Sequence, residues 1–268
     1  MEQPEGVQSD MNSTAQIQVE RSDGICTLRI NRPEKKNALN LAMYQGLADG
    51  IREAENDESV RVILISGGAG CFTSGNDLAD FLSDPPTGPE SAVMQFLSAI
   101  STARKPVVAA VAGLAVGIGV TMLLHCDLVY AGNGATFQMP FVNLGLCPEA
   151  GSTLLLPRIM GHQKAAELLL LGEVFSAAKA CSLGIVTEVC PDGEVLATSR
   201  NKALQLAAQP AAAVRLAKHL LKRDGAIPLR ETMTEEVKQF TDRLKSPEAA
   251  EALQAFVERR KPDFSPFS

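Results

Sequence analysis

The stretch of sequence that decides the fold is KPVVAAVAGLAVGIGVTMLLHCDLVYA, residues 105–131. Its β-branched run at 107–111 predicts a buried strand, and a glycine-rich turn follows. Residues 118–124 then fit a helix and residues 126–131 a second strand. Strand, turn, helix and strand in such close succession indicate an α/β fold.

The same stretch contains an uncharged run, 106–124, that is long enough to cross a bilayer. It holds three glycines and a proline, it is followed by His125, and no second such run occurs in the chain. A buried strand, a turn and a buried helix therefore explain it better, and we expect no membrane partner.

A second glycine loop lies upstream. Residues 60–65 form another β-branched run, and the sequence SGNDL at 74–78 stands before a further predicted helix. Glycine lets the backbone turn with positive φ, and N–H groups at a helix start lack intrahelical partners. Two such loops that meet would offer two donors to a developing negative oxygen. The pattern indicates chemistry on a carbonyl.

The chain as a whole fits an α/β core followed by helices. We expect a disordered polar tail at 1–14, a core at 15–190 and a helical C-terminal region at 191–268. A proline-rich loop at 83–89 is a candidate cover for a site. The local patterns predict a hairpin over 16–30 and helices over 39–55, 90–104, from Pro148 onward, 194–208, 211–222, 229–244 and 248–260.

Composition narrows the function classes. The 268 residues carry 25 Lys and Arg against 31 Asp and Glu, a net charge of −6, without a basic stripe, so we expect no nucleic-acid partner. The six cysteines form no Cys-x-x-Cys pair and no Cys/His cluster with the spacing of metal ligands, which predicts reduced, mostly buried thiols and no metal site. Residues 1–14 resemble neither a signal nor a transit peptide, so a cytoplasmic protein is expected.

Four motifs in order carry a resemblance to a known family. They are NRP at 31–33 with NAL at 37–39, SGNDL at 74–78, KPVVAAV at 105–111 with Gly113, and CDLVYA at 126–131. Together they resemble the crotonase (enoyl-CoA hydratase/isomerase) superfamily over residues 16–261. The resemblance implies a ββα superhelical spiral with a helical C-terminal region, homotrimers or hexamers, and acyl-CoA thioester substrates. It implies no separate cofactor, because coenzyme A is part of the substrate.

In that family two backbone N–H groups hold the thioester oxygen as an enolate. The resemblance places the first donor on Asn76 and the second on Ile118. An alternative is that the glycines only permit tight turns. The substrate-binding residues that the resemblance implies are Ser74, Gly75, Asn76, Asp77, Leu78, Gly117 and Ile118.

The choice of reaction rests on carboxylates. The two glutamates of family hydratases fall here on Thr121 and Phe141, neither of which exchanges a proton usefully at neutral pH. Cys147-Pro148-Glu149 instead resembles the Ser-Pro-Glu segment of peroxisomal-type Δ3,Δ2-enoyl-CoA isomerases, which implies that Glu149 is the catalytic base. The alternative for Glu149 is a structural one, because proline followed by glutamate is a good helix start.

An isomerase base that returns its proton needs a raised pKa, which apolar neighbours would supply. The candidates for that apolar wall are Phe137, Phe141, Leu144 and Leu146. We expect Asp77 to cap a helix and His125 to be a core residue. Lys35, Lys36 and the cations at 259–261 either meet the CoA phosphates or are solvated.

Three other functions stay open. Other crotonase-fold isomerases, including those acting on ring-epoxide acyl-CoAs, place a carboxylate at the position of Glu149. An enoyl-CoA hydratase fits the family but lacks its two glutamates here. A non-catalytic acyl-CoA-binding scaffold would keep the fold without needing Glu149.

Overall fold

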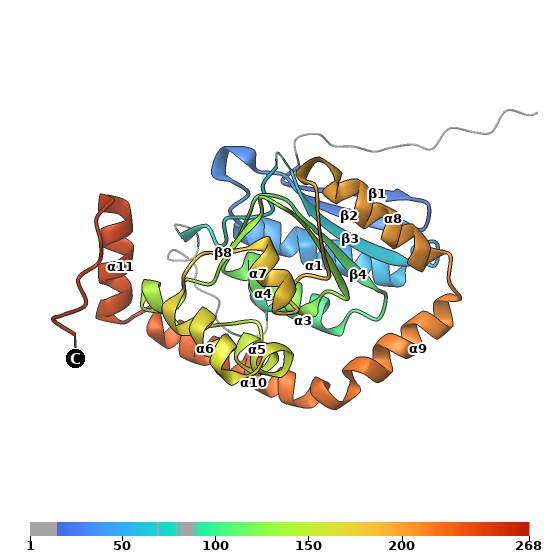
Figure 1. Ribbon diagram of the computed structural model, residues 1–268. Coiled ribbons are helices and arrows are strands. Elements are labelled where there is room, and N and C mark those ends of the chain that lie inside the picture. The colour runs from blue at the N-terminus through green and yellow to red at the C-terminus, as the bar shows by residue number, and fades with distance from the viewer. Residues whose placement is uncertain (1–14, 69, 79, 81–87, 89, 268) are drawn as a thin grey trace, which may run out of the picture.

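The computed structural model describes residues 15–68, 70–78, 80, 88 and 90–267 (Figure 1). The tail predicted at 1–14 and most of the loop predicted at 83–89 lie outside these residues.

A six-stranded sheet forms the centre of the fold, in the order β1-β2-β3-β4-β6-β9. β1 (Ile17–Ser22) and β2 (Ile25–Ile30) make the expected antiparallel hairpin. All later neighbours in this sheet are parallel, as expected for strands whose residues are apolar on both faces. The later strands are β3 (Val62–Gly67), β4 (Val107–Val111), β6 (Leu128–Gly132) and β9 (Glu188–Cys190).

A second, smaller sheet continues from the end of β4. It consists of β5 (Leu114–Val116), β7 (Thr136–Gln138) and β8 (Phe175–Ser176), in the order β5-β7-β8. These strands are too short for the sequence pattern to reveal. Together the two sheets confirm the expected mixed α/β architecture.

Helices cover both faces of the main sheet (Figure 1). α1 (Leu41–Asn56) and α3 (Ala92–Thr102) pack together on one face within the larger apolar core. α8 (Val195–Ala207) packs on the opposite face over β3, β4 and β6, where a smaller apolar cluster forms. α1 begins where Asn40 accepts a hydrogen bond from the N–H of Met43 at 2.8 Å.

The turn after β5 leads into α4 (Ile118–Thr121), which continues as a 3₁₀ turn, Met122–His125. Other 3₁₀ turns occupy Pro33–Lys35, Val142–Leu144, Asp192–Glu194 and Arg223–Gly225. Two more helices that the sequence pattern did not reveal follow, α6 (His162–Leu171) and α7 (Ala177–Ser182).

The helix expected from Pro148 begins later. α5 runs from Ser152 to Met160, so Pro148 and Glu149 lie in the preceding loop. Ala150 and Gly151 both have positive φ, +58° and +73°, which prevents a helix from starting earlier.

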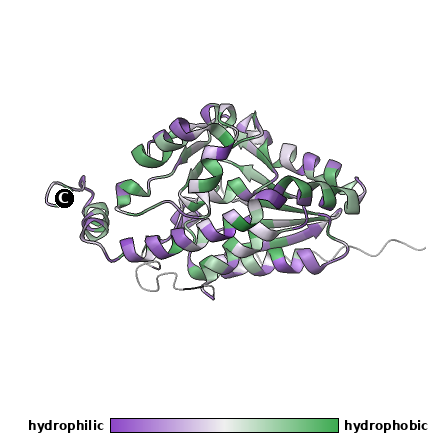
Figure 2. Cartoon of the chain, turned by 90° about the horizontal axis from the view of Figure 1, so that it is seen from below, coloured by the Kyte–Doolittle hydropathy of each residue, from purple (hydrophilic) through white to green (hydrophobic). Residues whose placement is uncertain are grey.

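The C-terminal helices are α9 (Ala211–Lys222), α10 (Ala226–Arg243) and α11 (Pro247–Glu258). α9 and α10 pass along the underside of the core, and α11 stands away from it (Figure 1). Seen from below, the helices on this side alternate hydrophilic and hydrophobic residues along their length (Figure 2). No helix in the described parts of the chain is both long and apolar enough to span a membrane.

All six cysteines are free, as expected, but the expectation that most are buried is wrong. Only Cys26 and Cys190 are buried, and the other four are partly exposed at the ends of elements and in loops.

Candidate active site

The two glycine loops lie side by side. Thr73 pairs with Ala115 in a parallel bridge, in which the N–H of Thr73 donates to Leu114 O at 3.0 Å. Gly75, with φ +94°, comes so close to this strand that a Cβ there would lie 3.0 Å from Val116 O. A larger residue at 75 would therefore separate the loops.

The backbone N–H groups of Asn76 and Ile118 have no hydrogen-bond partner within the described chain. For Ile118 the reason is its position as the first residue of α4, where no earlier helical carbonyl exists. For Asn76 the bridge to Leu39 uses the flanking groups instead, Gly75 O and the N–H of Asp77. Both predicted donors are thus free to bind a ligand oxygen.

The other residues of the 74–78 loop fasten it to the segment before α1. The N–H of Ser74 donates to Lys36 O at 3.1 Å, and Asp77 accepts a hydrogen bond from Arg32 at 2.7 Å. Leu78 begins a helical segment whose next residue is not described, so the capping role of Asp77 stays a prediction.

Glu149 lies in a loop between the second glycine loop and the C-terminal helices. Its side chain is buried, and Oε1 accepts a hydrogen bond from the hydroxyl of Thr121. Oε2 has no partner within the described chain and is not among the fully buried unpartnered atoms, so it reaches accessible space. Burial raises the pKa of Glu149 to about 8, against the opposing effect of the Thr121 hydrogen bond.

This placement overturns the structural interpretation of Glu149. Because α5 begins at Ser152, Glu149 is not in the first turn of a helix and does not stabilise a helix dipole from that position. A buried carboxyl with one free oxygen and a raised pKa is typical of a proton-transfer group.

Tyr44 connects the two halves of the site and was missed by the sequence analysis. Its buried hydroxyl, on α1, donates to the side-chain oxygen of Asn76. Burial raises the pKa of Tyr44, and the negative charge of Glu149 raises it further. Glu149 and Asn76 therefore both lie near the Tyr44 side chain. A buried tyrosine hydroxyl needs a polar partner. The tyrosine at position 44, among the apolar residues of the predicted helix, could therefore have indicated a buried polar contact.

His125 is a satisfied core residue, as expected. It is buried, and its Nε2 lies 2.8 Å from Ala150 O. Burial lowers its pKa to about 4, so the ring is neutral at pH 7 and donates from Nε2.

The predicted apolar wall is buried or partly buried. Phe137, Phe141 and Leu146 are buried, and Leu144 packs against the same core. Phe137 stacks on Phe175 at 5.6 Å between ring centroids. A direct role of these side chains beside Glu149 stays a prediction.

The cations considered for CoA differ in their surroundings. Lys35 and Lys36 are exposed, and their carbonyls accept hydrogen bonds from Ser74, so they border the 74–78 loop. Arg260 instead pairs with Glu251 at 2.5 Å and Glu258 at 2.6 Å, which neutralises its charge.

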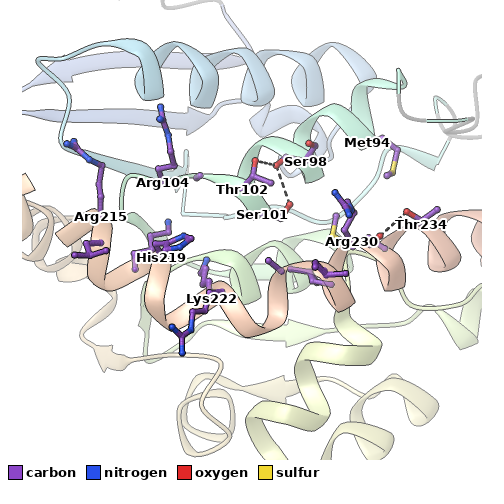
Figure 3. Close-up of a pocket in the computed structure, with 18 residues that line it drawn as sticks. Met94, Ser98, Ser101, Thr102, Arg104, Arg215, His219, Lys222, Arg230 and Thr234 are labelled. Carbon is purple, nitrogen blue, oxygen red and sulfur yellow. Dashed lines mark hydrogen bonds between the residues drawn. The ribbon is translucent and has the colours of Figure 1, made fainter. Parts of the chain in front are cut away.

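A cavity of about 860 Å³ lies between α3 and the α9–α10 segment (Figure 3). The residues that line it include Arg104, Arg215 and Arg230. Asn76, Ile118 and Glu149 do not line it, but Leu229 and Met233 of α10 line it and also approach Gly151. In the described residues no cluster of His, Cys, Asp and Glu could hold a metal ion.

The chain is similar to a known protein family and to several known proteins. The sequence profile of the family described as Enoyl-CoA hydratase/isomerase matches residues 20–266. Human "Enoyl-CoA delta isomerase 2" is 36% identical over 249 residues, which are 90% of this chain but only 63% of that protein, so the chain spans less than two thirds of its length.

Two other similarities cover nearly whole proteins. "1,2-epoxyphenylacetyl-CoA isomerase" of Escherichia coli is 35% identical over 256 residues, which are 90% of this chain and 95% of that protein. The solved structure of OdaA from Pseudomonas aeruginosa is 50% identical, with a TM-score of 0.90, and the match covers 92% of this chain and 100% of that one. The expected spiral fold with its helical C-terminal region is thereby confirmed.

Proposed function

The chain belongs to the enoyl-CoA hydratase/isomerase family, and we propose that it is a Δ3,Δ2-enoyl-CoA isomerase with a single catalytic glutamate. One observation carries the proposal. Glu149 is buried with a raised pKa and one free oxygen, in a site that also offers two unpartnered backbone N–H groups.

The proposed reaction moves one proton between two carbons. Ionised Glu149 removes a proton from C2 of a 3-enoyl-CoA, and the electron pair of that C–H bond forms a dienolate with its charge on the thioester oxygen. The N–H groups of Asn76 and Ile118 donate to this oxygen and stabilise the charge. Protonated Glu149 then gives the proton to C4, and the double bond moves to C2–C3. The atoms balance without a cofactor.

The raised pKa of Glu149 suits both steps. A base with a pKa near the working pH abstracts a proton and later returns it. Burial raises the pKa of Glu149 into this range, and the hydrogen bond from Thr121 keeps it from rising further.

Hydration is disfavoured by the residues at the two positions that correspond to the glutamates of family hydratases. Adding water to a double bond needs a second group that exchanges protons, and Thr121 and Phe141 occupy those positions. Thr121 is already committed as a donor to Glu149.

Exposed Lys35 and Lys36 support binding of an anionic CoA. They flank the loop that carries Asn76, and their positive charges attract the CoA phosphates.

A ring-epoxide acyl-CoA isomerase is the second candidate. The observation in its favour is the similarity to 1,2-epoxyphenylacetyl-CoA isomerase over 95% of that protein. A non-catalytic scaffold has less support, because binding alone does not require a buried glutamate such as Glu149 with one unpartnered oxygen.

The test compares three substrates with the purified full-length chain. We expect 3-hexenoyl-CoA to be converted to the conjugated 2-enoyl thioester, monitored by ultraviolet absorbance, and 2-hexenoyl-CoA to gain no water. Turnover of 1,2-epoxyphenylacetyl-CoA alone would favour the second candidate. Robust hydration of 2-hexenoyl-CoA would contradict the proposal.

A further inference from the structure

Glu236 is a buried carboxylate that the proposed mechanism does not use. It lies on α10, only 6% exposed, and reaches back to the start of α5. Its oxygens accept hydrogen bonds from the N–H of Gly151 at 2.5 Å, the N–H of Thr153 at 3.0 Å and the hydroxyl of Thr153 at 2.5 Å. Burial raises the pKa of Glu236, and these three donated hydrogen bonds oppose that effect because they stabilise the ionised form.

These hydrogen bonds fix the loop that carries Glu149. Ala150 and Gly151 are consecutive residues with positive φ, a backbone conformation that is unfavourable for alanine. Such a conformation persists only when its surroundings hold it. Here His125 donates to Ala150 O, and Glu236, on a different element, accepts from the next N–H.

α10 also fills the space behind this loop. A Cβ at Gly151 would lie 2.2 Å from the side chain of Leu229, which precedes Glu236 by about two turns on the same helix. Arg243, farther along α10, donates to Gly145 O at 2.9 Å. α10 therefore contacts both ends of the loop from 145 to 151.

We propose that Glu236 is a positioning residue of the isomerase: it holds residues 149–153 so that the Glu149 carboxyl rests against Thr121 with Oε2 open to the substrate. This inference rests on the proposed function. It gives the C-terminal helices a role in catalysis through the placement of the base.

Glu236 also acts on Glu149 electrostatically. Its negative charge raises the pKa of Glu149, though less than burial does. The other polar or titratable groups around the Glu149 loop are Tyr44 from α1, Thr121 from α4, His125 from the 3₁₀ turn and Cys147 from the loop itself. Removing the charge of Glu236 lowers the pKa of Glu149.

The decisive variant is Glu236→Gln in the full chain. We expect kcat for 3-hexenoyl-CoA to fall 5- to 50-fold with KM changed less than twofold, because a misplaced base affects the proton transfer and not the thioester contacts. The acidic limb of the kcat/KM profile should move to lower pH. Glu235→Gln is the matched control, since Glu235 is the adjacent, exposed residue.

The outcomes are separable. Unchanged kcat and an unchanged pH profile in Glu236→Gln overturn the inference, as does a loss of activity that the control shares. If Glu236→Gln does not fold, Thr153→Val removes only the hydroxyl bond, and a two- to fivefold loss of kcat at constant KM is then expected; no loss overturns the inference.

A second readout does not depend on isomerase activity. The carboxyl of Glu149, titrated by ¹³C NMR and assigned with the Glu149→Gln variant, should have a lower midpoint in Glu236→Gln than in the parent chain. If the parent chain fails to isomerise 3-hexenoyl-CoA, the proposed function fails, and this midpoint alone decides on Glu236. An equal midpoint overturns the inference.

Discussion

The hydroxyl of Thr121 donates a hydrogen bond to Oε1 of Glu149, and both side chains are buried. Thr121 is the last residue of the short helix that begins at Ile118, so one turn of backbone carries both a proposed oxyanion donor and the partner of the proposed base. The resemblance aligns Thr121 with a glutamate of family hydratases, and in this chain the Thr121 hydroxyl binds a different glutamate.

Thr121→Val should weaken the base. The hydroxyl lowers the pKa of Glu149, so its removal raises that pKa above about 8 and leaves less carboxylate at pH 7. We expect kcat at pH 7 to fall 5- to 50-fold and the acidic limb of the pH–rate profile to move to higher pH. Thr121→Ser, which keeps the hydroxyl, should retain most of the activity. A profile in Thr121→Val that matches the parent would contradict this role.

Tyr44→Phe should disturb the loop of Asn76. Loss of the hydroxyl leaves the Asn76 side-chain oxygen without its donor, which costs about 1–3 kcal/mol if that oxygen stays buried. We expect kcat/KM for 3-hexenoyl-CoA to fall about 3- to 30-fold. Tyr130→Phe is the matched control, because Tyr130 is the other tyrosine of the chain and lies buried on β6. Equal effects of the two variants would exclude a specific role for Tyr44.

The sequence predicted the parts of this site that depend on local pattern. The loop at 74–78 and the turn at 113–119 follow apolar strands, and both were expected to present N–H groups. Residues brought together by packing alone were not predictable in this way. Tyr44 and Glu236 sit on helices whose spacing says only that they face the core, and their partners are far away in the chain.

One local prediction was wrong for a physical reason. Pro148 followed by Glu149 is a good helix start, yet Ala150 and Gly151 take positive φ and delay α5 to Ser152. The conformation of Ala150 depends on contacts from His125 and on the neighbouring Glu236 bond, which no local pattern contains. The short strands of the second sheet were missed because two or three residues carry no periodicity.

The stability of the chain should depend on pH through Glu149. Its pKa is about 8 when folded and near 4.5 when exposed, so the folded state holds the proton over a range where the unfolded state has lost it. Unfolding free energy should therefore decrease as pH rises from about 4.5 to 8. Glu149→Gln lacks this pH dependence. His125 also makes stability depend on pH, but it does so equally in the parent chain and in the variant. In denaturant unfolding at pH 5, 6.5 and 8, the free energy of unfolding of Glu149→Gln should increase relative to that of the parent chain as the pH rises. A difference that stays constant with pH would refute the assignment.

We propose that the chain assembles as a trimer or hexamer, and α9 offers the surface. On the buried side of α9, Lys218 forms an ion pair with Asp127 at 2.6 Å. Three leucines of α9 are more than half exposed: Leu216, Leu220 and Leu221. Leu220→Glu with Leu221→Glu should give monomers in sedimentation velocity, and deletion of 248–268 should weaken assembly and CoA affinity. Gln205→Glu on α8 should leave assembly intact. A monomeric, fully active parent would contradict the prediction.

The most informative single change is Glu149→Gln. Glutamine keeps the size of the side chain and can still accept the Thr121 hydrogen bond, but it cannot take up and return a proton. The N–H groups of Asn76 and Ile118 are unaffected, so acyl-CoA affinity should stay within about threefold, measured by calorimetry with a non-reactive saturated acyl-CoA. If Glu149 is the base, kcat for 3-hexenoyl-CoA should fall roughly 10²- to 10⁴-fold, the usual contribution of a positioned acid–base group. The melting temperature at pH 7 should not fall, because the change removes a carboxyl that is costly to ionise in its buried place. Near-normal kcat with intact folding would remove Glu149 from the mechanism, and a loss of kcat accompanied by a large loss of stability would mean that the residue acts on the fold instead.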